Sequence, residues 1–228
     1  MTFELAARLP PKCNITDLAE FLFEDQGFKS ADDATADLDE IVLSDVMQKR
    51  VGIPMALGVL LKSLASTAAV DARFIKFPGF SILKSKTEQG TQYLDLKRRG
   101  KVLTRDEILD LLHEEAMLQK RSEQISFECV DDEELMSNYL TRLGLEYQDR
   151  RDDSRSLVIF EALLNLQPKN LSVLRDRSMA YYRMNRFGDA LQDLKRFFSF
   201  SNPDQQPREL LQLYDDLQKK VDHPSPQP

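Results

Sequence analysis

The chain has 228 residues, 42% of them apolar, so it is long enough to fill the core of one large domain or two small ones. Its formal net charge of −7 argues against a nucleic-acid-binding surface, because affinity for phosphates depends mainly on Lys and Arg. The two cysteines, Cys13 and Cys129, form no CxxC pair, so neither a disulfide framework nor a zinc site is expected. The first residues contain no basic region followed by an apolar core, and we expect a cytoplasmic protein.

The N-terminal part predicts helices separated by a polar stretch. Residues 14–28 place apolar side chains at helical spacing behind a cap at Asn14 or Thr16. The acidic stretch 30–40 lacks the alternating ligands, central glycine and closing glutamate of an EF-hand, so no metal site is expected there. Residues 41–47 predict a short helix.

The next segment is the predicted central element of the fold. Proline is tolerated at the first position of a helix, so Pro54 predicts a helix start, and residues 55–69 continue it as a largely buried helix. This helix is shorter than the roughly twenty apolar residues of a membrane span, so no membrane association is expected. Strand-like runs follow at 72–77, 80–83 and 92–96. We therefore predict an α+β fold in which the helix packs on a small antiparallel sheet.

A basic turn and a further helix end this half of the chain. The run 97–101 (KRRGK) fits a solvated hairpin loop better than an anion site. Thr104 and Glu107 form a capping box that predicts a helix over 105–118. The polar residues 119–131 are predicted to link two domains.

The second half, residues 131–222, predicts helices that repeat every 34 residues. Small residues that would let two helices approach recur at Gly144, Ser156, Ser178 and Ala190. This spacing is typical of tetratricopeptide repeats, and we predict two of them. A helix at 207–221 would cover the last repeat, and the Pro-rich tail 223–228 is expected to be disordered.

The sequence contains little that supports catalysis. A thiol or serine nucleophile needs a base, nearly always histidine, and the only histidines are His113 in a charged helix and His223 in the tail. Neither Cys13 nor Cys129 follows a sharp turn into a helix, the setting that lowers a thiol pKa. Walker, dinucleotide-binding and nucleophile-elbow motifs are absent, so we expect neither an enzyme nor a cofactor.

Four motifs occur in the order KRVGIPMALGVLL, FPGFSILK, YLDLKRRGKVLT and LRDRSMAYYRMNRFGDALQDLKRFF. In this order the chain resembles the bacterial transglutaminase-like family with C-terminal tetratricopeptide repeats, the Sir B type named after a regulator of invasion genes. The resemblance covers about residues 18 to 203. It implies a papain-like transglutaminase core in residues 1–120, followed by the repeats and a capping helix in 131–222.

The resemblance also implies that the catalytic positions have changed. The place of the nucleophilic cysteine falls on Pro54 and that of the histidine on Phe80, whereas the acid position keeps Asp95. Because nucleophile and base are both replaced, we predict a pseudoenzyme. Asp95 would then be a structural residue, hydrogen-bonded to the backbone or to a nearby Tyr or Arg.

We therefore expect a non-catalytic binding or regulatory protein that acts on gene expression indirectly and holds a protein or peptide partner on its repeats. Phe198 and Phe200 are candidate partner contacts, although they would also fit beneath the last helix. The alternative is a cysteine hydrolase or acyltransferase with a relocated nucleophile. That alternative predicts an exposed Cys13 that folds back over the helix start and lies close to Asp95.

Overall fold

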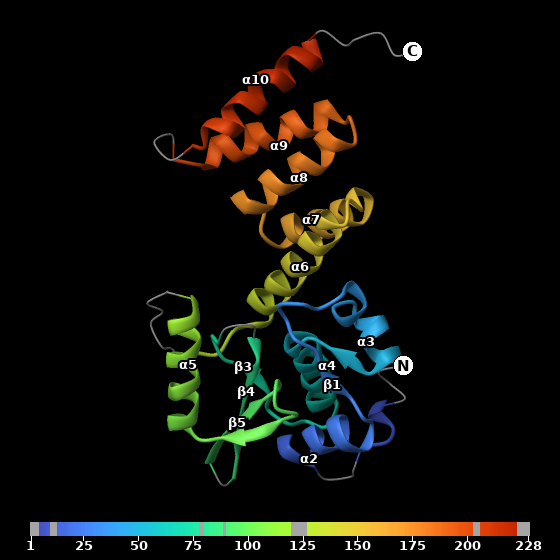
Figure 1. Cartoon of the computed structure of the whole chain (residues 1–228), viewed down its shortest axis with the longest axis vertical. Coiled ribbons are helices and arrows are strands. Elements are labelled where there is room, and N and C mark those ends of the chain that lie inside the picture. The colour runs from blue at the N-terminus through green and yellow to red at the C-terminus, as the bar shows by residue number, and fades with distance from the viewer. Residues whose placement is uncertain are drawn as a thin grey trace. The chain divides into compact units, whose positions relative to one another are not determined.

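The structure, a computed structural model, describes residues 5–9, 13–77, 80–88, 90–119, 127–202 and 206–222 (Figure 1). It divides into two units, Met1–Leu135 and Met136–Pro228. The first unit combines helices with a small antiparallel sheet and the second is helical, so the predicted α+β class is confirmed. In the ranges described, no helix is both long and apolar enough to cross a bilayer. The predicted tail 223–228, with His223, lies outside these ranges.

The described residues of the first unit form two sheets. Strands β1 and β2 form a parallel pair, and β3, β4, β5 and β6 form an antiparallel sheet in that spatial order. The elements in chain order are α2 (Ile15–Glu20), the π-helical turn η1 (Phe21–Asp25), β1 (Lys29–Ser30), the 3₁₀ turn η2 (Leu38–Glu40), α3 (Leu43–Lys49), β2 (Val51–Gly52), α4 (Pro54–Thr67), β3 (Arg73–Phe74), β4 (Ile82–Thr87), β5 (Gly90–Asp95), β6 (Lys101–Leu103) and α5 (Arg105–Gln119).

Local sequence signals explain where the first helices begin. Asn14 Oδ1 accepts hydrogen bonds from the backbone N–H groups of Thr16 at 2.8 Å and Asp17 at 3.1 Å. The Asp17 carboxylate accepts one from the Asn14 N–H in return, which completes a capping box. Pro54 occupies the first turn of α4 after Ile53 in an extended conformation, so the predicted start of the central helix is the observed one.

Helices α4 and α5 lie on opposite sides of the sheet (Figure 1). On one face, Gly58 of α4 approaches Phe74 and Leu96 closely. On the other face, α5 contributes to a second cluster of buried side chains. That cluster comprises Ile75, Phe77, Ile82, Leu103, Ile108 and Leu112. Because successive strand residues point to opposite faces, Phe74 and Ile75 serve different layers.

The sheet is larger than the sequence predicted. Strand β6 was not predicted, and its first residue, Lys101, was assigned to the basic turn, but β6 pairs with β5. The end of the predicted linker also joins the sheet edge, because the Val130 N–H donates to the Phe74 carbonyl at 2.8 Å and Cys129 bridges Ile75. Phe80, expected in a strand, lies before β4 in a turn with φ of 48°. Its N–H donates to the Phe77 carbonyl at 3.0 Å, which replaces strand pairing at that residue.

The second unit consists of helices packed on their sequence neighbours. They are α6 (Asp132–Asp149), whose first four residues are assigned to the first unit, α7 (Asp153–Leu166), α8 (Leu171–Arg183), α9 (Phe187–Phe200) and α10 (Arg208–Asp222). A Cβ at Gly144 would lie 2.7 Å from Phe160 Cε1, so this glycine lets α6 approach α7. Ser156, Ser178 and Ala190 are each completely buried. Small residues thus lie at helix contacts with the 34-residue spacing, while the assignment of tetratricopeptide repeats stays a prediction.

Candidate functional site

Asp95 ends strand β5, and its carboxylate organises the turn that follows. The side chain is buried, with 3% of the residue exposed. Its Oδ1 accepts hydrogen bonds from the backbone N–H groups of Lys97 at 2.9 Å and Arg98 at 3.4 Å. The Asp95 carbonyl accepts the N–H of Gly100 at 2.8 Å, and Gly100 takes the positive φ of 75° that closes the turn. The Arg98 guanidinium lies 3.7 Å from Oδ2.

The other two positions of the predicted triad carry no group that transfers protons. Pro54 is buried at the start of α4. Phe80 is partly buried, and its ring meets the ring of Phe74 edge-on with centroids 6.3 Å apart. Both side chains are hydrocarbon, so neither attacks a carbonyl or takes up a proton.

Helix α4, which begins with Pro54, contacts residues next to the other two positions. Gly58, one turn after Pro54, contacts Phe74, the ring partner of Phe80, and Leu96, the residue after Asp95. Asp95 itself lines a cavity of about 170 Å³. Phe77, Ser81, Arg98, Leu111 and Glu114 also line this cavity, whereas Pro54 and Phe80 are not among the described residues that do so. Whether the three positions correspond to a lost triad therefore stays a prediction.

The hydrogen bonds of Asp95 predict how its substitution affects stability. We expect Asp95→Ala to lower the free energy of unfolding by about 1–2 kcal/mol, because two backbone donors lose their buried acceptor. Asp95→Asn keeps one acceptor oxygen and should cost less than about 0.5 kcal/mol, since the lost ion pair involves an exposed Arg98. Urea unfolding of both variants measures the difference. Equal stability of Asp95→Ala and the unmodified chain would contradict a structural role.

The alternative nucleophile, Cys13, is not in the setting that the alternative required. It is partly buried and lines a different cavity, of about 440 Å³, together with Asp71 and Ser85. Burial, and to a smaller extent the nearby Asp17, raise the pKa of the Cys13 thiol above its ordinary value. A raised pKa keeps the thiol protonated at neutral pH, which opposes nucleophilic attack. His113 is exposed on α5. Among the described residues, no cluster of His, Cys, Asp and Glu could hold a metal ion.

A groove of about 460 Å³ in the second unit is the other candidate site. It is lined from α6 by Gln148 and Asp149, from α8 by Arg175 and Met179, and from α10 by Leu210. The Gln148 amide donates to the Asp176 carbonyl at 3.2 Å, which connects α6 to α8. These residues were not singled out from the sequence. The predicted repeats could have pointed to them, because the first helix of each repeat, here α6 and α8, lines the same surface as its counterpart in the next repeat.

The charges in the groove are only partly neutralised within the protein. Arg175 contacts Asp176 at 2.8 Å, and Arg183 contacts Asp153 at 2.9 Å. Arg151, also in the lining, has no side-chain hydrogen bond or ion pair in the part of the chain that the structure describes. One guanidinium in the groove is therefore available to a ligand.

Phe198 and Phe200, the predicted partner contacts, differ in their surroundings. Phe198 packs edge-on against Tyr214 of α10, with ring centroids 5.5 Å apart, and so lies beneath the last helix. Phe200 is 44% exposed, and the Lys169 ammonium lies 5.6 Å from its ring centroid. Of the two rings, Phe200 is the one that a partner can reach.

Comparison with known proteins agrees with the geometry of the first unit. Residues 2–141 match the sequence profile of the Transglutaminase-like superfamily. The chain belongs to this family. The family profile covers α4, the antiparallel sheet and α5, which carry the Pro54, Phe80 and Asp95 positions. No solved structure matches the chain.

The chain is similar to several curated proteins, one of which has the Sir B name that the sequence motifs suggested. A UPF0162 protein of Xylella fastidiosa is 25% identical over 181 residues, 78% of this chain and 64% of the relative. The UPF0162 protein YchA of Escherichia coli is 24% identical over 197 residues, 85% of this chain and 72% of the relative. Protein SirB1 of Salmonella typhimurium is 24% identical over 159 residues, 70% of this chain and 59% of the relative. The chain thus spans just under two thirds of the length of the Xylella protein.

Proposed function

We propose that this member of the transglutaminase-like superfamily is a non-catalytic regulatory protein that binds a protein partner through its helical unit. The observation that carries the proposal is the groove lined by α6, α8 and α10, whose lining includes Met179 and Arg151, a cation with no ion pair in the described residues. Grooves between successive helices are suited to holding helical or extended segments. A partner segment with a carboxylate for Arg151 and an apolar side chain for Met179 would complement this surface.

The surroundings of the three predicted triad positions support the non-catalytic part of the proposal. The Asp95 carboxylate is occupied with backbone N–H groups, and the groups at Pro54 and Phe80 are hydrocarbon. The Cys13 thiol has a raised pKa, which makes it a poor substitute nucleophile. We further propose that residues 1–120 form the inactive core, that 131–222 form the repeats with their capping helix, and that any effect on gene expression is indirect.

The groove is tested by matched charge reversals in the full-length chain. Arg151→Glu changes the groove, whereas Lys195→Glu makes the same change in charge on the exposed surface of α9, outside the groove lining. In affinity capture quantified by mass spectrometry, we expect a protein retained by the unmodified chain and by Lys195→Glu to be depleted about tenfold or more by Arg151→Glu. The same set of retained proteins for both variants would refute the groove as the binding site.

An assay for transglutaminase and deamidase activity tests the proposal that the chain is not catalytic. The purified chain should neither incorporate a primary amine into a glutamine-containing peptide nor release ammonia from it above the blank. Turnover that is lost on Cys13→Ser would instead favour the relocated nucleophile, and turnover that persists in that variant would point to another enzymatic group.

A further inference from the structure

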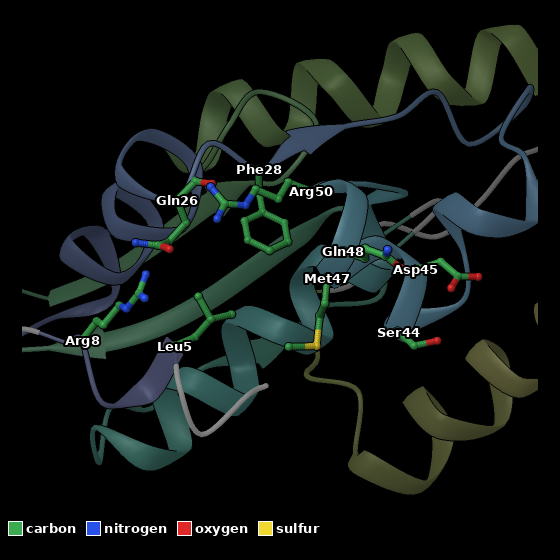
Figure 2. A pocket seen from close by; sticks show the side chains of 9 residues that line it. All are labelled: Leu5, Arg8, Gln26, Phe28, Ser44, Asp45, Met47, Gln48 and Arg50. Carbon is green, nitrogen blue, oxygen red and sulfur yellow. The ribbon is translucent and has the colours of Figure 1, made fainter.

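A cavity of about 560 Å³ lies in the first unit where three segments meet: residues 5–8, 26–28 and 44–50 (Figure 2). Its size falls within the range of about 300–1,000 Å³ that is usual for small-molecule sites. None of its described lining residues belongs to the cavity around Asp95. It is therefore a candidate binding site separate from the predicted triad positions and from the groove in the helical unit.

Arg50 supplies a fixed positive charge at this cavity. Its backbone takes the left-handed conformation, with φ of 59°, which is uncommon for a residue with a side chain. The Arg50 N–H donates to the Val46 carbonyl at 2.8 Å, and its carbonyl accepts the Lys29 N–H at 2.8 Å, so the backbone is held on both sides. The guanidinium Nη1 donates to the Gln26 carbonyl at 2.6 Å. The side chain is thus anchored at one nitrogen before any ligand arrives.

The remaining donors of Arg50 have no partner within the described ranges, and the Arg8 guanidinium has none there either. Arginines elsewhere in the first unit differ, because Arg98 contacts Asp95 and Arg99 contacts Glu24. In a chain with net charge −7, two guanidinium groups that line one cavity without an ion pair to a carboxylate in the described ranges are an unusual arrangement. Planar guanidinium groups match carboxylates through two parallel hydrogen bonds.

Apolar side chains line the cavity next to these cations. Figure 2 shows the ring of Phe28 beside Arg50, with Leu5 and Met47 further along the cavity. Phe28 is 1% exposed, so its ring is a rigid part of the lining. Asp45 also lines the cavity, and its carboxylate has no hydrogen bond or ion pair in the described part of the chain. The cavity therefore offers a cationic region, an apolar wall and one acidic group.

We propose that this cavity binds a carboxylate attached to an apolar body, with the carboxylate on Arg50 and Arg8 and the apolar body against Leu5, Phe28 and Met47. Such a group is present in small aromatic or aliphatic acids and at the C-terminus of a peptide that ends in an apolar residue. Asp45 and the net charge of −7 repel ligands with several negative charges, so nucleotides and polyphosphates fit poorly. The ligand carries a single negative charge at one end.

The test is isothermal titration of the full-length chain with four probes. 3-Phenylpropionate represents the small acids, an acetylated tripeptide ending in phenylalanine represents a chain terminus, the same peptide as its C-terminal amide removes the charge, and inorganic phosphate represents a bare anion. For a fragment of this size we expect Kd of about 1 mM for at least one of the two carboxylates. The amide and phosphate should bind at least about tenfold more weakly.

Variants locate the binding at the cavity. Arg8→Gln removes a cation that has no ion-pair partner in the described ranges. Arg50→Asn introduces asparagine, a residue type that tolerates the left-handed backbone conformation of this position. Each should weaken carboxylate binding by about tenfold to a hundredfold. The control Lys29→Gln removes one exposed positive charge from neighbouring β1, outside the cavity lining, and should leave Kd within about twofold.

The titrations distinguish a small-molecule ligand from a peptide terminus and can also refute the proposal. Binding of 3-phenylpropionate alone supports a small-molecule ligand, and binding of the peptide acid but not of its amide supports a chain terminus. Failure of both carboxylates to bind at about ten times the expected Kd overturns the proposal. Equal Kd for the unmodified chain and Arg8→Gln also overturns it, and this comparison stands if Arg50→Asn proves too unstable to purify.

Discussion

Replacement of Asp193 by alanine is expected to lower the free energy of unfolding of the helical unit by about 3–5 kcal/mol. Asp193 on α9 is 2% exposed, and its two oxygens accept hydrogen bonds from Nε and Nη2 of Arg177 on α8, each at 2.7 Å. Removal of the carboxylate leaves a guanidinium between two packed helices with no strong acceptor, since alanine offers none. Denaturant unfolding followed by far-UV circular dichroism measures the effect.

An exposed pair at the start of the same helix provides the control. Asp189 contacts Arg186 at 2.7 Å, but both side chains are nearly half exposed. Asp189→Ala should therefore cost about 1 kcal/mol or less. Arg177→Met in the Asp193→Ala background should recover part of the loss, because it removes the orphaned charge. Equal losses for Asp193→Ala and Asp189→Ala would contradict the importance of burial.

Arg177, which pairs with Asp193, should keep its positive charge throughout the physiological pH range. The hydrogen bond to Asp193 is the main reason that the pKa of Arg177 is raised above its ordinary value, with burial acting in the opposite direction. A base whose folded-state pKa is raised loses its stabilising contribution only as the pH rises through that pKa, which for arginine lies far above physiological pH. Titration of Arg177 therefore adds no pH dependence under physiological conditions.

The sequence predicts best those features that depend on neighbouring residues. Of the two predicted caps, Asn14 is the one that caps α2. Thr104 and Glu107 form the predicted capping box of α5, in which the Glu107 N–H donates to Thr104 Oγ1 at 3.2 Å. Pro54 marks the start of α4 because a proline ring fixes φ and removes a donor that a first turn does not need. These signals need no knowledge of the tertiary fold.

Features that depend on distant residues were missed. Strand β6 has three residues, too few for alternation to be read, and it forms because β5 offers a free edge. Val130 joins the sheet through the Phe74 carbonyl, although its own neighbourhood is polar and resembles a linker. The cavity beside Arg50 is lined by three separate segments between residues 5 and 50, and no local sequence pattern predicts it. For Asp95 the sequence predicted a structural role with hydrogen bonds to the backbone or to a nearby Tyr or Arg, but not which N–H groups would donate to its carboxylate.

Gly58→Ala is expected to destabilise the first unit by about 2 kcal/mol, although alanine is favoured over glycine within helices by up to about 1 kcal/mol. A Cβ at this position would lie 2.3 Å from Phe74 Cζ and 2.7 Å from Leu96 Cδ1. Both partners are almost completely buried, so neither can move away without disturbing the layer between α4 and the sheet. Thermal and urea unfolding of the variant measure the cost.

Gly188→Ala is the matched control, because Gly188 is also helical and a Cβ there would meet no atom within 4 Å. That variant should be neutral or more stable by up to about 1 kcal/mol. In a Phe74→Leu background, which removes the clashing ring atom, the cost of Gly58→Ala should fall by at least about 1 kcal/mol, although Phe74→Leu is itself destabilising. If Gly58→Ala instead stabilised the chain as Gly188→Ala does, α4 would not pack on the sheet at the short distance at which Gly58 meets Phe74 and Leu96.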